Sequence, residues 1–146
     1  FEWTQNIWLR AVILLIIALF GLNSIVKLHP YEYTYYNSIV GGTSGAEGSF
    51  ETDYWLTCYK EAAEAFGEFA PAGETLIVYR EARNVSYYAA ENIKLVESKD
   101  ISLKAGDYLL LAARLDEVNT VKKHSPNIIE IGRDGATFCA IREIAP

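Results

Sequence analysis

The stretch HPYEYTYYN, residues 29–37, marks a change in the character of this chain. The sixteen residues at positions 11–26, which precede it, carry no charged side chain. The stretch GGTSGAEG at positions 41–48, which follows it, contains four glycines in eight residues. An apolar run followed by tyrosines and then by glycines is typical of a chain that leaves a membrane, so this junction divides the sequence into two parts.

The apolar run predicts a transmembrane helix over residues 7–26. Twenty residues of helix span about 30 Å, the thickness of the hydrocarbon core of a bilayer. The run has no polar face, which distinguishes it from an amphipathic surface helix. Aromatic residues flank it, as at the two interfaces of a membrane: Trp3 and Trp8 before it, and Tyr31, Tyr33, Tyr35 and Tyr36 after it. One basic residue at each end leaves the orientation open, and a buried helix of a soluble protein is the alternative.

The remainder of the chain is acidic. The 146 residues have a net charge of −6, and the part from residue 29 onward carries 11 Lys and Arg against 18 Asp and Glu. This balance argues against nucleic acid as a partner and against adhesion to anionic lipid, because both need a basic surface. The chain begins at Phe1 and contains no Met. Since it lacks the basic start and the cleavage site of a signal peptide, we expect a piece of a longer reading frame.

We expect three regions: a transmembrane helix with its flank at 1–28, an aromatic and glycine-rich juxtamembrane segment at 29–53, and a small domain at 54–146. Pro30 ends the helix, because the residue before a proline avoids the helical conformation. Residues 31–36 alternate weakly, which predicts an extended segment along the headgroups. The glycines at 41–48 predict a loop.

The small domain is predicted to be α/β (α+β), with a mixed sheet of about five strands and two or three helices. Asp53 is suited to be the N-cap of a helix over residues 54–69, in which apolar residues recur at helical spacing. Short apolar strands at 75–79 and 93–97 enclose a short helix at 84–91. This order predicts a right-handed parallel crossover.

The C-terminal third of the chain predicts the rest of the sheet. The strand at 107–113 is the most apolar and is expected at the centre, followed by a brief helix at 116–122. Arg133-Asp134-Gly135 separates two further strands, at 127–132 and 136–144. Because Asp-Gly is a strong turn signal, these strands predict a C-terminal β-hairpin.

The two cysteines, Cys58 and Cys139, have two interpretations. If the domain lies outside the cytoplasm they can form a disulfide across a long loop, and otherwise they are two buried thiols in a helix and a strand. No CxxC spacing or histidine cluster accompanies them, so we expect no metal site.

Motifs of known catalytic or cofactor chemistry are absent from the sequence: there is no GxSxG, HExxH, phosphate-binding P-loop or GxGxxG pattern. We therefore assign no catalytic residue and expect no cofactor. Glu51 and Asp53 lie beside Trp55, and carboxylates with an aromatic face suit sugar binding; helix capping by Asp53 and packing of Trp55 are the alternative. His29 is placed to contact a lipid phosphate or act as a base, or else is a solvated capping group.

The order of these pieces adds a resemblance. A membrane helix, HPYEYTYYN, a Gly-Gly turn, FETDYW at residues 50–55 and YKEAA at 59–63 together resemble the C-terminal end of bacterial family-39-like glycosyltransferases. Those polytopic membrane enzymes are similar to dolichyl-phosphate-mannose protein mannosyltransferases. The resemblance covers roughly residues 25–63.

The resemblance implies transfer of a sugar from a polyprenyl-phosphate carrier to a glycan or protein acceptor on the extracytoplasmic side of the cell membrane. In that family the catalytic acidic residue lies in the first outer loop of the full protein, which precedes this chain. We thus expect a non-catalytic membrane anchor and outer domain, in contact with membrane lipid. Its candidate residues for binding substrate or a lipid headgroup are His29, Tyr31, Tyr33, Asn37, Glu51, Asp53 and Trp55.

Two other functions are compatible with the same order of segments. One is a single-pass membrane protein whose outer domain binds a partner. The other is a pilin-like filament subunit, which an N-terminal apolar helix with an α/β head resembles. Against the pilin stand Gln5, where pilins generally use Glu, the charge of Arg10 and the early helix break at Pro30.

Overall fold

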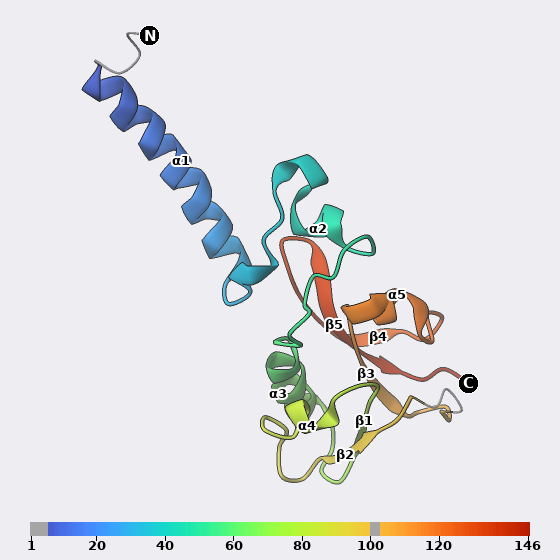
Figure 1. The fold of residues 1–146 in the computed structure, drawn as a ribbon. Helices are drawn as coiled ribbons and strands as arrows, with labels where there is room; N and C mark the ends of the chain where they lie inside the picture. Colours follow the sequence, from blue (N-terminus) through green and yellow to red (C-terminus); the bar gives the residue numbers. More distant parts are fainter. Residues whose placement is uncertain (1–5, 100–102) are drawn as a thin grey trace.

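The computed structural model describes residues 6–99 and 103–146 (Figure 1). A long N-terminal helix, α1, projects from a domain built on a mixed five-stranded sheet with helices on both faces. The α+β class predicted from the sequence is confirmed. Two residues used in the sequence analysis, Trp3 and Gln5, lie outside the described residues.

Helix α1 extends over Ile7–Leu28. It begins where the Asn6 side chain accepts hydrogen bonds from the amides of Trp8 and Leu9, and it ends at His29, whose amide still donates to the Ile25 carbonyl. The helix is therefore two residues longer than predicted. It is long and apolar enough to cross a membrane, and within the described chain only its last residue, Leu28, is buried.

The sheet has the strand order β2-β1-β3-β5-β4. β1 is parallel to β2 and β3, whereas β5 is antiparallel to both β3 and β4. The strand bounds are β1 Thr75–Val78, β2 Lys94–Glu97, β3 Tyr108–Ala112, β4 Asn127–Arg133 and β5 Ala136–Glu143. The apolar strand β3 is central, as predicted, and four of its five residues are buried. The parallel crossover from β1 to β2 and the C-terminal hairpin are also confirmed.

The turn of the hairpin explains its clear sequence signal. Asp134 and Gly135 have φ angles of 51° and 79°. A two-residue turn with positive φ at both positions matches the right-handed twist of the flanking strands, and Asp-Gly adopts it at low cost.

The two faces of the sheet carry separate apolar cores. Helices α3 (Tyr59–Phe69) and α4 (Ala82–Val85) cover one face, where Phe66 and Phe138 are fully buried. Helix α5 (Glu117–Thr120) covers the other, with Val118 packed over Leu109. Each large apolar side chain removed from water contributes roughly 1.5–3 kcal/mol to stability, so both faces hold the domain together.

Three local predictions in the first half of the chain were wrong. The extended segment at 31–36 is interrupted by a single 3-10 turn, η2 (Glu32–Thr34), because the ring of Tyr31 is drawn into the core. The loop at 41–48 contains a short helix, α2 (Gly42–Ala46), preceded by a 3-10 turn, η3 (Ser38–Val40). Helix α3 begins at Tyr59 rather than at residue 54, since Leu56 has a φ of 60° and cannot continue a helix.

Two helices of the second half differ in extent. The helix predicted at 84–91 is α4, which ends at Val85 and continues as hydrogen-bonded turns. The helix predicted at 116–122 is α5, preceded by a 3-10 turn, η4 (Arg114–Asp116). Leu115 and Asp116 both have positive φ there, which prevents one continuous helix.

Candidate functional site

The segment that leaves α1 is part of the domain core. The Tyr31 side chain is 1% exposed, and its ring centroid lies 4.9 Å from that of Phe138 on β5. The guanidinium of Arg133 lies 5.0 Å from the centre of the same ring. Burial, followed by the nearby Glu61 carboxylate, raises the pKa of the Tyr31 hydroxyl well above its usual value. Tyr31 is thus a neutral core residue that attaches the segment after α1 to the sheet.

Arg133, at the end of β4, reinforces this attachment. Its Nη2 donates to both carboxylate oxygens of Glu61 on α3, at 2.7 and 3.0 Å, and its Nε donates to the carbonyl of His29 at 3.0 Å. A guanidinium suits this arrangement because its donors are held in a rigid fork. One side chain therefore joins the end of α1, helix α3 and the hairpin.

Asp53 joins the juxtamembrane segment to the start of α3. Its carboxylate is fully buried and accepts hydrogen bonds from the amides of Thr57 and Cys58, at 3.1 and 2.9 Å, and from the Tyr33 hydroxyl. Burial and this bond to the carboxylate raise the pKa of Tyr33. Asp53 therefore caps amides that precede the helix instead of the first turn of a helix starting at residue 54.

Cys58 and Cys139 form a disulfide with a Cα–Cα distance of 5.8 Å. The Asp53 carboxylate lies beside them, and the oxygen and sulfur atoms of the three residues are within 4.8 Å of one another. A metal would need the thiolates of the two cysteines, and the disulfide removes them. With the disulfide formed, the three residues are structural parts of the core.

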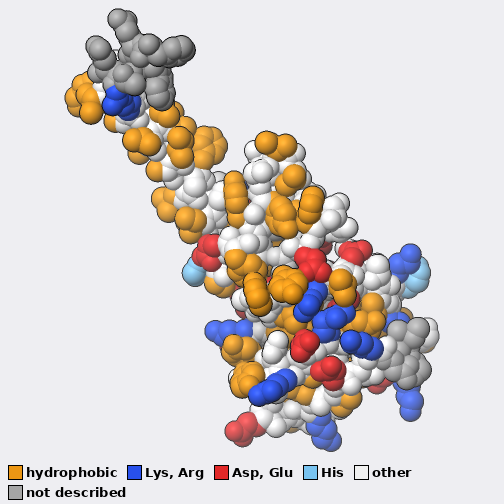
Figure 2. All heavy atoms as spheres, in the orientation of Figure 1, with side chains coloured by type: hydrophobic (Ala, Val, Ile, Leu, Met, Phe, Trp, Pro, Cys, Tyr) orange, Lys and Arg blue, Asp and Glu red, His pale blue; other side chains and the backbone are white. Residues whose placement is uncertain are grey.

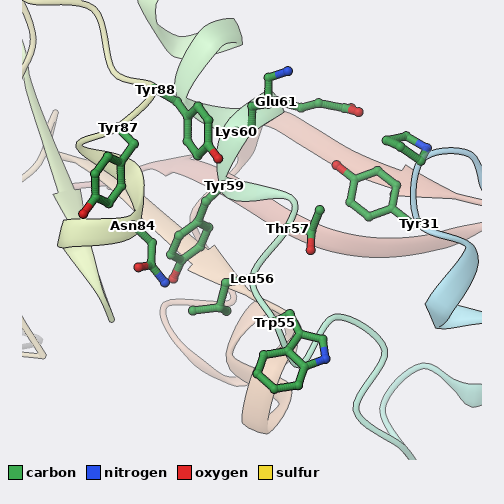
Figure 3. A pocket seen from close by; sticks show the side chains of 11 residues that line it. Tyr31, Trp55, Leu56, Thr57, Tyr59, Lys60, Glu61, Asn84, Tyr87 and Tyr88 are labelled. Carbon is green, nitrogen blue, oxygen red and sulfur yellow. The ribbon is translucent and has the colours of Figure 1, made fainter.

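A cleft of about 330 Å³ opens beside the segment that follows α1 (Figure 3). We call it the aromatic cleft, because tyrosines and a tryptophan form much of its wall. Its lining consists of Pro30, Tyr31, Trp55, Leu56, Thr57, Tyr59, Lys60, Glu61, Asn84, Tyr87 and Tyr88. Pro30 follows the end of α1 by two residues, so the cleft lies next to the point where the helix joins the domain.

Local structure explains how the cleft is built. Tyr59 comes from the first turn of α3, and its hydroxyl donates to the Arg80 carbonyl at 2.8 Å, which holds the ring against the floor. Trp55 belongs to the turns before α3, whereas Tyr87 and Tyr88 follow α4. Figure 3 shows Tyr87 and Tyr88 on one side of Tyr59, Tyr31 on the other, and the Asn84 amide near the Tyr59 hydroxyl.

The cleft exposes large aromatic surfaces. The exposed fractions of Trp55, Tyr87 and Tyr88 are 73%, 69% and 47%. Exposed aromatic side chains grouped around a hollow usually mark a binding surface. Asn84 and Lys60 add hydrogen-bond donors at the rim, whereas Glu61 is already engaged by Arg133. This set of groups fits binding of a hydroxylated ligand better than proton transfer.

The seven residues predicted to bind substrate or headgroup do not form one site. Tyr31 and Trp55 line the aromatic cleft. His29 is exposed outside it, and its Nδ1 lies 2.7 Å from a carboxylate oxygen of Glu32. Asn37 accepts hydrogen bonds from the amides of Ile39 and Val40 and so caps η3.

The remaining three predicted residues tie the segment to the domain. Asp53 and Tyr33 bond to each other, as described above. Glu51 is partly buried, and its carbonyl accepts a hydrogen bond of 3.0 Å from the Tyr36 hydroxyl. Their contacts are structural, and the cleft is completed by other residues.

Sequence reasoning missed most of the cleft. Tyr59, Lys60, Asn84, Tyr87 and Tyr88 were not candidates. The available signal was the adjacent pair Tyr87-Tyr88, since two successive large aromatics on a short helix or turn cannot both face the core.

No protein-family model, no curated protein and no solved structure matches the chain. The resemblance to lipid-carrier glycosyltransferases therefore rests on the sequence of residues 25–63, and the function that it implies remains an expectation.

Proposed function

We propose that this chain is the membrane anchor and extracytoplasmic domain of a glycosyltransferase that uses a lipid-linked sugar, and that the aromatic cleft binds a sugar of the donor or the acceptor. The observation that carries the proposal is the position of the cleft. It begins at Pro30, immediately after the helix that is long and apolar enough to cross a membrane.

The composition of the cleft supports a saccharide as its ligand. Indole and phenol rings offer flat apolar faces with a polar edge, and a pyranose presents the complementary combination of C–H faces and hydroxyls. Trp55 and Tyr87 are exposed enough to stack on such a ring, and Asn84 can bond to its hydroxyls. A carrier anchored in the bilayer would present its sugar at this height.

The disulfide supports the proposed side of the membrane. Disulfides persist in oxidising compartments and are rare in the cytoplasm. The bond between Cys58 and Cys139 therefore favours a domain on the extracytoplasmic side.

Saccharide binding can be tested on this chain in lipid nanodiscs. Saturation-transfer NMR with the methyl glycosides of glucose, mannose and galactose would detect it, and we expect at least one to bind with a dissociation constant on the order of millimolar. Trp55→Ala should weaken that binding about tenfold, because one aromatic stacking contact is worth roughly 1–1.5 kcal/mol. Val96→Ala is the matched control, since Val96 is an exposed apolar residue on β2 outside the cleft.

The transferase itself requires a second experiment. The reading frame upstream of Phe1 should encode further hydrophobic spans and an acidic outer loop, and the extended protein should transfer sugar from a polyprenyl-phosphate hexose. Trp55→Ala should reduce this transfer and Val96→Ala should not. A start codon directly before Phe1, or equal transfer by both variants, would overturn the proposal.

A further inference from the structure

A second exposed apolar surface lies beside α1, on the lobe formed by residues 35–50. Its tip is the turn η3, where Ile39 is 92% exposed. Tyr35 and Phe50 are also exposed on the lobe. No charged residue occurs from position 33 to position 46. The tip therefore carries no charged side chain, the kind that costs most free energy to place in a membrane.

The tip satisfies its own backbone amides. The amide of Ile39 donates to the Asn37 side chain at 3.0 Å, and that of Val40 donates to the Asn37 carbonyl at 3.3 Å. The next two amides also donate to backbone carbonyls of the turn. The Gly41 amide donates to the Ser38 carbonyl at 3.2 Å, and the Gly42 amide donates to the Asn37 carbonyl at 3.0 Å. Four successive N–H groups therefore have partners within the turn, which lowers the cost of placing this backbone in an apolar medium.

The glycines of the tip have a structural reason. Gly41 has a φ of 86°, a conformation in which a side chain is strained. A Cβ on Gly45 would lie 2.1 Å from the Val40 carbonyl oxygen. These glycines close a compact turn that holds Ile39 outward, and an ordinary flexible loop would not need them.

The lobe lies at the level of the C-terminal half of α1. A groove of about 710 Å³ separates the two, and its walls are α1 on one side and the lobe on the other. The α1 residues that line it reach back to Ile17, about three helical turns before the end of the helix. The lobe contributes Tyr35, Tyr36, Ser38, Gly41 and Gly42. Figure 1 shows the lobe, with α2, rising on the same side of the domain as α1.

The groove has an apolar part and a charged end, as a phospholipid has acyl chains and a charged headgroup. Ile17 and Phe20 form its apolar part, whereas Lys27 and Asp134, 3.6 Å apart, lie at the end nearer the domain. In Figure 2, hydrophobic side chains are frequent on α1 and the lobe, and apart from a basic side chain near the outer end of α1 the charged side chains gather below them on the rest of the domain. Apolar atoms are thus presented on the membrane side and charges on the water side.

We propose that the tip at Ile39 inserts into the leaflet through which α1 leaves the membrane, with lipid filling the groove between them. The contact gives the domain a second attachment, and two attachments restrict how the aromatic cleft is oriented above the membrane. The inference rests on the proposed membrane crossing of α1.

The test uses the whole chain in phosphatidylcholine nanodiscs with an environment-sensitive fluorophore on a single new cysteine. The native cysteines are joined in the disulfide, so labelling without reductant is confined to the new thiol. Three positions are compared: Ile39→Cys at the tip, Leu15→Cys on α1, and Glu91→Cys on the exposed far side of the domain. Nitroxide-labelled lipids then quench any fluorophore that lies in the bilayer. Since Ile39 is exposed, labelling should leave the fold intact, and near-UV circular dichroism checks this.

We expect quenching to lower the emission roughly twofold or more at positions 15 and 39, with little change at position 91. Quenching at 15 without quenching at 39 would overturn the inserted tip and leave the membrane anchor standing. No quenching at either position would overturn both. Cross-linking between two Ile39→Cys chains without lipid quenching would identify a second copy as the occupant and also overturn the inference.

Discussion

Removing the disulfide should strongly destabilise the domain that follows α1. The bond joins the start of α3 to β5 across a sequence separation of 81 residues. In the chain-entropy treatment, a loop of that length restricts the unfolded state by about 4.5 kcal/mol at 25 °C. Both cysteines are fully buried. Domains of this size are stable by roughly 5–15 kcal/mol in total, so the loss is a large fraction.

The double variant Cys58→Ala/Cys139→Ala isolates this effect. We expect its thermal midpoint in detergent micelles, followed by near-UV circular dichroism, to fall by about 18 °C, at roughly 4 °C per kcal/mol. Reductant should lower the midpoint of the unmodified chain and leave that of the variant unchanged. Two free thiols in the denatured, unreduced chain would refute the pairing. An unchanged midpoint for the variant would refute the entropic reasoning.

Two further predictions concern buried polar groups. Asp53→Asn should lower the free energy of unfolding by roughly 2–3 kcal/mol in urea titrations, because an amide presents its own NH2 to backbone donors. Tyr33→Phe removes one of the three bonds and should cost about 1 kcal/mol; an equal loss in both variants would contradict this account. Burial, followed by the Glu117 carboxylate, raises the pKa of Tyr59. Its folded pKa thus exceeds the unfolded value near 10, and stability that is complete below pH 10 should decline as pH rises. The decline is about 1.4 kcal/mol per pH unit for this group. Because the pKa values of Tyr31 and Tyr33 are raised as well, Tyr59→Phe should reduce the alkaline decline in the urea midpoint without abolishing it. An unaltered slope would show that Tyr59 does not contribute to it.

The elements that sequence reasoning located correctly are those with a local cause. Helix α1 follows from a predominantly apolar run of twenty residues, which needs no distant partner to form a helix. The hairpin follows from Asp134-Gly135, because its turn geometry is specified by two residues. The central place of β3 follows from a continuous apolar run, since only a strand covered on both faces has that composition.

The errors of prediction occurred where a distant contact overrides a local preference. Residues 31–36 alternate like an extended segment, but the ring of Tyr31 packs on Phe138 and a 3-10 turn results. The bond from Arg133 to the His29 carbonyl spans a separation of 104 residues. No window of the sequence contains both partners, so no periodicity could indicate the contact.

The amino-acid sequence by itself determined that this chain has a helix long and apolar enough to cross a membrane, an acidic α+β domain and an aromatic junction between them. Hydrophobic length, charge and turn chemistry are properties of neighbouring residues. Only the tertiary structure decided what the junction does. It buries Tyr31, engages Asp53 with the start of α3, and leaves Trp55, Tyr87 and Ile39 exposed. Which side chains are covered and which are offered to a ligand or a bilayer depends on contacts between segments far apart in the chain, and such contacts exist only after folding.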